Sequence, residues 1–236
     1  MEDGLIAAVR ADLVRCADET VRDGAQRFFK EDVKFHGVRS GDVRKIANRH
    51  FRNLKGRDKG EIFYLCEELL KSGYGEEAFI AFEWAFSIKK RFVPKDFDVF
   101  KSWIEKYVDN WAKCDTICNH TLGSFIEMYP EHIADLKAWT MSENRWLRRA
   151  SAVTLILPAR KGMFLRDVLE ISDLLLKDED DLVQKGYGWM LKEASKIHQE
   201  EVFDYVMSRK SEMPRTALRY SIEKMPEDLR RQAMQR

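Results

Sequence analysis

The sequence is poor in the residues that interrupt helices. Its 236 residues include only 5 prolines and 12 glycines, and no serine- and glycine-rich linker divides the chain. We find no convincing run in which apolar and polar residues alternate, the pattern of a half-buried strand. These absences argue against a β-rich fold and against domains joined by a flexible linker.

Cysteines and long apolar runs are also scarce. Four cysteines in a chain of this length indicate no disulfide framework, so a reducing compartment is expected. The longest apolar stretches, such as "AFIAFEWAF", are too short or too interrupted to span a bilayer. The amino terminus, "MEDGLIAAVRADLVRC", is acidic at its start and amphipathic, unlike a secretory signal. We therefore expect a cytoplasmic protein, associated with the nucleoid if the source is bacterial.

An excess of charge of one sign is absent as well. The chain carries 41 basic and 40 acidic residues, for a formal net charge of +1. Overall charge thus neither supports nor excludes a nucleic-acid partner. Such a partner requires that the basic groups gather on one face of the protein.

Amphipathic helices fill most of the chain. Apolar residues recur at i, i+3, i+4 and i+7, and strong helices begin near residues 76, 114, 144, 183 and 215. Helix pairs that recur every ~30–45 residues are typical of HEAT-like repeats. We expect Ser142 to cap the helix of "ENRWLRR", and the acidic run 178–181 to favour a helix start. The sequence predicts one all-α domain, 1–236, an α-solenoid of antiparallel helix pairs; a compact helical bundle is the alternative.

Three of these helices carry unusual residues. Trp111 and Asp115 stand at i, i+4 in "NWAKCD", and Trp146 and Arg149 at i, i+3 in "NRWLRRA", so each pair shares a helix face. In "LVQKGYGWMLKEASK", Lys185, Trp189 and Lys192 share a face. Taken singly, each group has an ordinary structural explanation, because a tryptophan often packs into the core and a nearby charge is often solvated.

Two glycines in the last of these helices raise a separate question. At an interior helical position Gly186 and Gly188 each cost roughly 1 kcal/mol relative to alanine. Glycine has no Cβ, so it permits the close approach of a ligand or of another backbone. The glycines therefore indicate either tight packing of this helix against a neighbour or a close approach under a binding surface.

Other kinds of catalytic site find little support. Cys114, Cys118 and His120 lie close together, but no fourth ligand stands at a zinc-like spacing. No serine occupies a nucleophile elbow, and no glycine-rich phosphate loop or dinucleotide fingerprint is present. The sequence predicts no metal and no organic cofactor.

Five segments, in order, resemble a known family. "WAKCDTICNHTLG", "SENRWLRRASAV" and "VQKGYGWMLKEASK" are similar to the three signature segments of the AlkD-like DNA glycosylases, the HEAT-like DNA alkylation repair family. Upstream, "KFHGVRSGDVRKIA" resembles the family's first conserved segment, and "MPRTALRYSIEKM" resembles its last helix. Each segment alone is weakly specific, but the five together cover most of the chain.

The resemblance implies an enzyme with a concave, basic DNA face. It implies a monomeric, monofunctional glycosylase that hydrolyses the N-glycosidic bond of cationic N3- or N7-alkylated purines in double-stranded DNA. Asp115 matches the catalytic carboxylate, and Trp111 and Trp189 match the aromatic walls around the lesion. The residues that it implies for DNA binding are Arg148, Arg149, Lys185, Lys192, Arg215, Arg219 and Phe28.

The sequence departs from the family pattern at two positions. Phe28 stands where many members of the family have a tyrosine. Asn110 precedes Trp111, at a position where the family pattern has another aromatic residue. A catalytically inactive DNA-binding paralogue and a protein-interaction scaffold remain the alternative functions. The presence of Asp115 with both tryptophans favours the enzyme, because a pure DNA binder has no use for a carboxylate in an anionic groove.

Overall fold

The computed structural model describes residues 2–235 and confirms the all-helical prediction. Within these residues the only β pairing is one isolated bridge between Lys34 and Tyr74. None of their helices is long and apolar enough to cross a membrane. The chain forms two compact units, Met1–Ile117 and Cys118–Arg236, which we describe separately. The single domain and the concave basic face expected from the sequence stay predictions.

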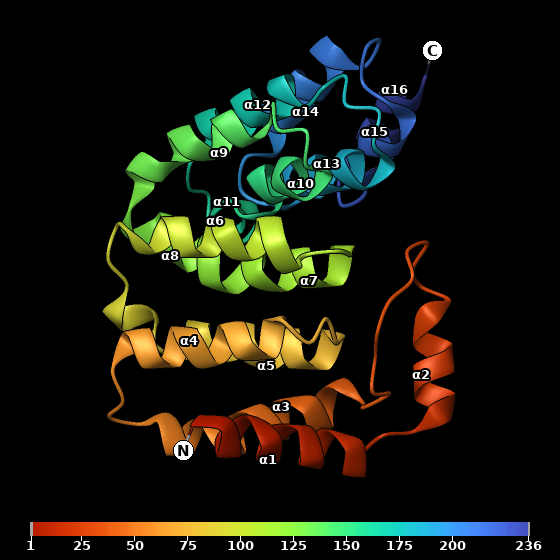
Figure 1. Cartoon of the computed structure of the whole chain (residues 1–236). Coiled ribbons are helices and arrows are strands. Elements are labelled where there is room, and N and C mark those ends of the chain that lie inside the picture. Colours follow the sequence, from red (N-terminus) through yellow and green to blue (C-terminus); the bar gives the residue numbers. More distant parts are fainter. Residues whose placement is uncertain (1, 236) are drawn as a thin grey trace. The chain divides into compact units, whose positions relative to one another are not determined.

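Unit 1 consists of helix pairs stacked in layers (Figure 1). α1 packs on α3 and α4 packs on α5, while α5 also contacts α3 and α7. α2 stands at one edge of these layers. The helices of unit 1 are α1 (Glu2–Arg15), α2 (Glu19–Gln26), α3 (Ser40–Phe51), α4 (Lys59–Leu70), α5 (Gly75–Ser87), α6 (Asp96–Tyr107) and α7 (Trp111–Thr116), with 3-10 turns η1 (Arg52–Leu54) and η2 (Lys89–Arg91).

Large aromatic residues fill the core between the layers of unit 1. Trp84 and Trp103 are almost completely buried, as are Phe82 and Phe100. The indole N–H of Trp84 donates to the carbonyl oxygen of Ala47 at 3.0 Å, which ties α5 to α3. Burial of an aromatic side chain of this size stabilises the fold by about 2–3 kcal/mol. The buried aromatic residues thus hold α3 and α5 together.

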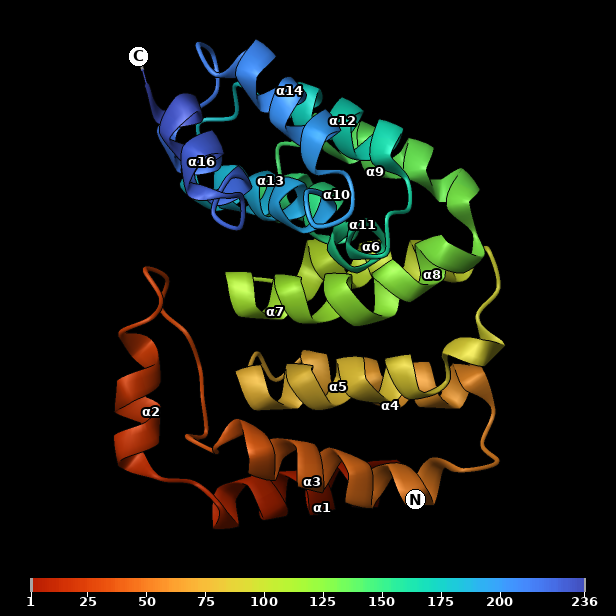
Figure 2. The ribbon, with the colours of Figure 1, turned by 180° about the vertical axis from the view of Figure 1, so that it is seen from behind.

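Unit 2 is organised around α13, which packs on α10, α11, α12 and α15 (Figure 2). Its first helix follows α7 through η3 (Ile117–Leu122), which is a turn of π-helix. The helices of unit 2 are α8 (Gly123–Met128), α9 (Ile133–Trp139), α10 (Arg145–Val153), α11 (Ile156–Arg160), α12 (Leu165–Leu174), α13 (Asp181–Ala194), α14 (Gln199–Arg209), α15 (Arg215–Ser221) and α16 (Glu227–Met234), with the 3-10 turn η4 (Pro130–His132).

The start of α13 is as predicted from the sequence, whereas α10 has a different cap from the one predicted. Asp180, in the acidic run, caps α13 by accepting the backbone N–H of Leu182 at 2.9 Å. The prediction that Ser142 caps α10 is wrong. Asn144 is the cap, and its Oδ1 accepts the N–H of Trp146 at 2.9 Å. The Ser142 hydroxyl instead accepts the N–H of Asn144 at 3.1 Å, so it shapes the turn before the helix.

Candidate functional site

Trp111 and Asp115 lie on one turn of α7. Asn110 caps this helix, because its Oδ1 accepts the backbone N–H of Lys113 at 3.1 Å. An aromatic residue at position 110 cannot supply that acceptor. Trp111 and half-buried Asp115, four residues apart, share a face of the helix. The π-helical turn follows directly, and such turns occur often at functional sites.

The segment after α2 fixes the ring of Trp111. The indole N–H donates to the carbonyl oxygen of Phe28 at 3.3 Å. The ring of Phe29 stacks on the indole with centroids 5.1 Å apart and an interplanar angle of 18°, and Phe35 packs against Phe29 at 5.6 Å. The sequence pointed to Phe28, which is 76% exposed and whose role in DNA binding stays a prediction. The adjacent Phe29 is the residue that sequence reasoning missed.

A buried carboxylate anchors this segment to α5. Glu76 is 5% exposed, and its oxygens accept the backbone N–H groups of His36, Gly37 and Val38 at 2.9–3.0 Å. Hydrogen bonds to an ionised acceptor are stronger than neutral ones. Gly37 has a φ of +90°, and a Cβ there would lie 2.4 Å from the carbonyl oxygen of Asp18. The "HGV" of the first family-like segment therefore serves to place the aromatic support of Trp111.

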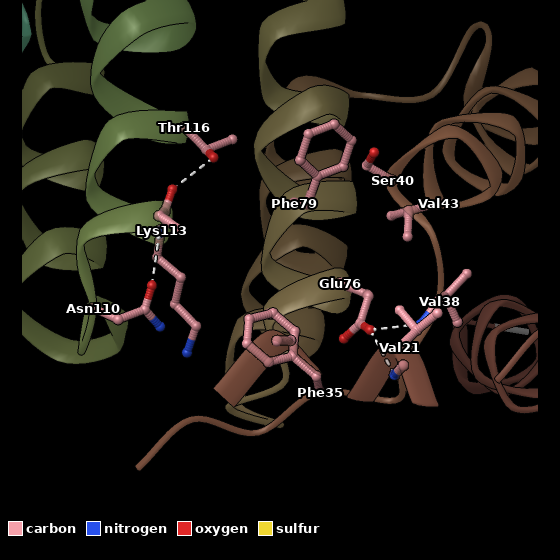
Figure 3. A pocket seen from close by; sticks show the side chains of 14 residues that line it. Val21, Phe35, Val38, Ser40, Val43, Glu76, Phe79, Asn110, Lys113 and Thr116 are labelled. Atoms are coloured by element: carbon pink, nitrogen blue, oxygen red, sulfur yellow. Dashed lines mark hydrogen bonds between the residues drawn. The ribbon is translucent and has the colours of Figure 1, made fainter. Parts of the chain in front are cut away.

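A mostly apolar cavity of about 260 Å³ lies beside α7 (Figure 3). On α7 it is lined by Ala112, Lys113 and Thr116, and neither Trp111 nor Asp115 contributes to its wall. The Thr116 hydroxyl donates to the carbonyl oxygen of Ala112 at 2.7 Å. The Lys113 ammonium is bound by the Gly73 carbonyl and by Asp109, at 2.9 and 2.8 Å. The cavity is thus separate from the helix face that carries Trp111 and Asp115.

In unit 2, the two glycines of α13 face different neighbours. A Cβ on Gly186 would lie 3.5 Å from Cγ of Arg149, so this glycine adjoins α10. A Cβ on Gly188 would lie 2.7 Å from Cβ of Tyr220 and 2.8 Å from the carbonyl oxygen of Ala217, both on α15. Arg149 is 5% exposed, and its guanidinium donates to the carbonyl oxygen of Leu182. Close helix packing therefore accounts for Gly188.

Trp189, on the same helix, is bound by a carboxylate. Its indole N–H donates to Oε1 of Glu193 at 3.4 Å. Glu193 is 4% exposed, and its Oε2 pairs with Arg160 and Lys196, each at 2.6 Å. Burial by itself raises the pKa of Glu193, but the hydrogen bonds from Arg160 and Lys196 outweigh it and leave that pKa below its usual value. Glu193 is therefore ionised at neutral pH and orients the indole.

Glu193→Gln is expected to loosen Trp189 while α13 stays folded. The amide is a weaker acceptor than the carboxylate, so the indole N–H loses a charge-assisted hydrogen bond. Arg160 and Lys196 are partly exposed, so their heads can turn to water, and the expected loss of stability is only about 1 kcal/mol. We expect the Nε1–H signal of Trp189 to move upfield in a ¹H–¹⁵N spectrum, with assignment from Trp189→Phe. An unmoved signal contradicts this role of Glu193.

The remaining cations of unit 2 fall into two groups. Arg148, Lys185 and Lys192 are paired with Asp178, Asp181 and Glu223 at 2.7, 2.7 and 2.9 Å. Arg215 and Arg219 are exposed on α15, and within residues 2–235 neither has a carboxylate within 4.0 Å.

The predicted site residues are divided between the two units. Trp111, Asp115 and Phe28 belong to unit 1, and the other predicted site residues belong to unit 2. Their location on one common face stays a prediction.

Comparison with known proteins identifies the family. The family model described as "DNA alkylation repair enzyme" matches residues 9–225. The chain belongs to the DNA alkylation repair enzyme family. The resemblance found in the five sequence segments is thus confirmed at the level of the family. None of the curated proteins matches the chain.

Two solved structures have a fold similar to that of this family member. A predicted DNA alkylation repair enzyme from Enterococcus faecalis superposes with a TM-score of 0.80 at 16% identity, over 89% of this chain and 97% of that one. The Pseudomonas fluorescens alkylpurine DNA glycosylase AlkC, solved bound to DNA containing an abasic site analog, superposes with a TM-score of 0.55 at 13% identity. That match covers 94% of this chain and 62% of AlkC.

Proposed function

We propose that the protein is a DNA glycosylase that releases cationic N3- or N7-alkylated purines from duplex DNA. The observation that carries the proposal is the carboxylate of Asp115, which lies one helical turn from the fixed indole of Trp111 in a member of the DNA alkylation repair enzyme family. The same family context makes duplex DNA the expected partner, and the structurally similar glycosylase AlkC was solved bound to DNA containing an abasic site analog.

Few protein groups are needed for this reaction. A purine alkylated at N3 or N7 already carries a positive charge, so it leaves without protonation by a general acid. Cleavage of the N-glycosidic bond passes through an oxocarbenium-like sugar. In the proposal, the Asp115 carboxylate stabilises that cation and orients the attacking water. The faces of Trp111 and Trp189 each attract the cationic lesion or sugar by about 0.5–2 kcal/mol.

The support around the tryptophans suits the binding of a cationic lesion. Each indole N–H has an acceptor, the carbonyl of Phe28 for Trp111 and the carboxylate of Glu193 for Trp189. Both tryptophans are half-exposed, and rings held in fixed positions are preorganised for a cationic ligand. Arg149 enters the proposal, by its match to the family, as the residue that positions a phosphate; because it is 5% exposed, this contact requires its guanidinium to turn away from the carbonyl oxygen of Leu182.

Release of 7-methylguanine from methylated duplex DNA tests the proposal directly. We expect wild-type protein to release the free base and to leave an intact strand with an abasic site, since no lyase group is invoked. Strand cleavage without added alkali contradicts a monofunctional glycosylase. Duplex binding without base release identifies the inactive paralogue, and the absence of both identifies the scaffold.

Exposed arginines on α15 should make DNA binding sensitive to salt. Each phosphate that a cation neutralises contributes about 0.9 to the slope of log K against log salt. Arg215→Gln together with Arg219→Gln is therefore expected to lower that slope by about 1.8. Arg166→Gln together with Lys177→Gln is the matched control, because it removes the same charge from unit 2 outside α10, α13 and α15. Fluorescence anisotropy titrations at several salt concentrations measure both slopes, and equal losses contradict the prediction.

A further inference from the structure

Two short segments of unit 1 concentrate positive charge. Residues 52–59 and 89–96 contain eight lysines and arginines against two aspartates, a local charge of +6 in a chain whose net charge is +1. Glu61 and Asp98 follow them in the first turns of α4 and α6, and with these two included the local charge is still +4. We call the two segments together the basic edge.

The two segments of the basic edge are in contact. The guanidinium of Arg91 donates to the carbonyl oxygen of Arg57 at 2.9 Å. Lys59 binds Asp96 at 2.7 Å, and Asp96 also accepts the backbone N–H of Val93 at 2.8 Å. These bonds join the turn between η1 and α4, and the start of α4, to η2 and the start of α6. The charges therefore gather on one continuous surface of unit 1.

Most cations of the basic edge have no acidic partner. The second aspartate, Asp58, caps α4 by accepting the N–H of Gly60 at 2.7 Å. Lys89 lies 4.0 Å from the centroid of the Phe86 ring, which is a cation–π contact and not an ion pair with a carboxylate. Within the described part of the chain, seven cations of this surface have no carboxylate within 4.0 Å: Arg52, Lys55, Arg57, Lys89, Lys90, Arg91 and Lys95.

The basic edge and Trp111 lie at opposite ends of the helices of unit 1. Gly75, at the start of α5, adjoins the segment that supports Trp111, whereas η2 follows the end of α5. At 1.5 Å per residue, the 13 residues of α5 span about 20 Å. Figure 1 shows the links from α3 to α4 and from α5 to α6 on the side of unit 1 away from α2. DNA bound at Trp111 would thus contact an edge of unit 1 other than the basic edge.

The composition of this surface favours a phosphate backbone over a protein or a lipid bilayer. Protein interfaces are depleted in lysine and have an apolar centre, and membrane-surface segments insert apolar side chains. None of the large exposed hydrophobic residues of the described chain falls in the basic edge. Unpaired cations without an apolar anchor match the phosphate contacts of sequence-independent DNA binding.

We infer that the basic edge is a second DNA-binding surface, which holds the phosphates of a duplex segment other than the one at Trp111 and Asp115. This inference depends on the proposed function only for the duplex segment that binds at Trp111 and Asp115. A protein with two such surfaces can hold undamaged DNA while it presents its site to a second segment.

Native mass spectrometry with a short undamaged duplex tests the inference by stoichiometry. We expect wild-type protein in excess duplex to form a complex of one chain with two duplexes. The variant Lys55→Gln/Lys90→Gln/Lys95→Gln is expected to form only the complex of one chain with one duplex. The matched control is Lys71→Gln/Lys101→Gln/Lys106→Gln, which removes the same charge from unit 1 outside the basic edge and should retain the second duplex.

Salt titration and vesicle binding give independent readouts. In wild-type protein, three phosphate contacts by Lys55, Lys90 and Lys95 are expected to give the second binding step a salt slope of at least about 2.7 in magnitude, and the triple variant is expected to show no such step. A wild-type protein that binds only one duplex, or equal behaviour of the two triple variants, overturns the inference. If the basic-edge triple variant loses binding to vesicles that contain phosphatidylserine but still binds two duplexes, the basic edge is a lipid-binding surface. That result also overturns the inference.

Base release separates this inference from the proposed function. The stoichiometry experiment uses undamaged DNA and requires no catalysis. A chain that binds two duplexes but releases no methylated purine contradicts only the glycosylase proposal. A chain that releases the purine but never binds a second duplex contradicts only the basic edge. Equal thermal unfolding of both triple variants by circular dichroism confirms that they are folded.

Discussion

Asp115→Asn is expected to lower the rate of base release at least about 100-fold, while duplex affinity stays the same or rises slightly. The substitution keeps the shape of the side chain but removes the negative charge that stabilises the oxocarbenium-like sugar, and the loss of one such preorganised group costs about 10²–10³ in rate. It also removes repulsion between the carboxylate and the phosphates, so binding should not weaken. Single-turnover release of 7-methylguanine and a gel-shift titration measure the two quantities.

The control for Asp115→Asn is Asp98→Asn. Asp98 is an exposed aspartate on α6 in the same unit, so its replacement makes the same change in charge away from α7. We expect Asp98→Asn to release the base at the wild-type rate. If Asp115→Asn also does so, the carboxylate is not the catalytic group, and the proposed mechanism is wrong even if the protein binds DNA.

Local spacing was sufficient to place the central pair of this site. Trp111 and Asp115 are four residues apart, and four residues complete about one turn of a helix, so their shared face follows from the sequence once α7 is recognised. The start of α13 was predictable for the same reason, because a capping aspartate acts on the next two or three backbone N–H groups. Both inferences need only neighbouring residues.

The supports of the two tryptophans depend on contacts that spacing does not encode. Phe28 and Phe29 are identical in type, and only the path of the segment anchored by Glu76 decides that Phe29 stacks on Trp111. Glu193 lies among other charged residues in the sequence, a pattern that is typical of a solvated helix face. Its burial follows from packing against α11, where Arg160 binds it across 33 positions of sequence. Long-range pairing of this kind cannot be read from one helix.

Gly188→Ala and Gly186→Ala are expected to change stability in opposite directions, although they are the same substitution on one helix. A Cβ at position 188 would lie 2.7 Å from Cβ of Tyr220, 2.8 Å from the Ala217 carbonyl oxygen and 3.2 Å from its Cα. These are atoms of or next to the α15 backbone, so the two helices must separate. Overpacking of this kind costs about 1–3 kcal/mol, which exceeds the gain of about 1 kcal/mol in helix propensity.

At position 186 the atoms nearest to the new methyl group belong to Arg149 and Val153, at 3.5–3.6 Å, which is ordinary van der Waals contact. Gly186→Ala should therefore keep most of the propensity gain and raise the free energy of unfolding by about 0.5–1 kcal/mol. Urea denaturation measures both variants, with a shift of the midpoint at constant slope. Because α15 carries Arg215 and Arg219, Gly188→Ala should also weaken duplex binding more than Gly186→Ala does. A Gly188→Ala protein more stable than wild type shows that α13 and α15 are not in close contact.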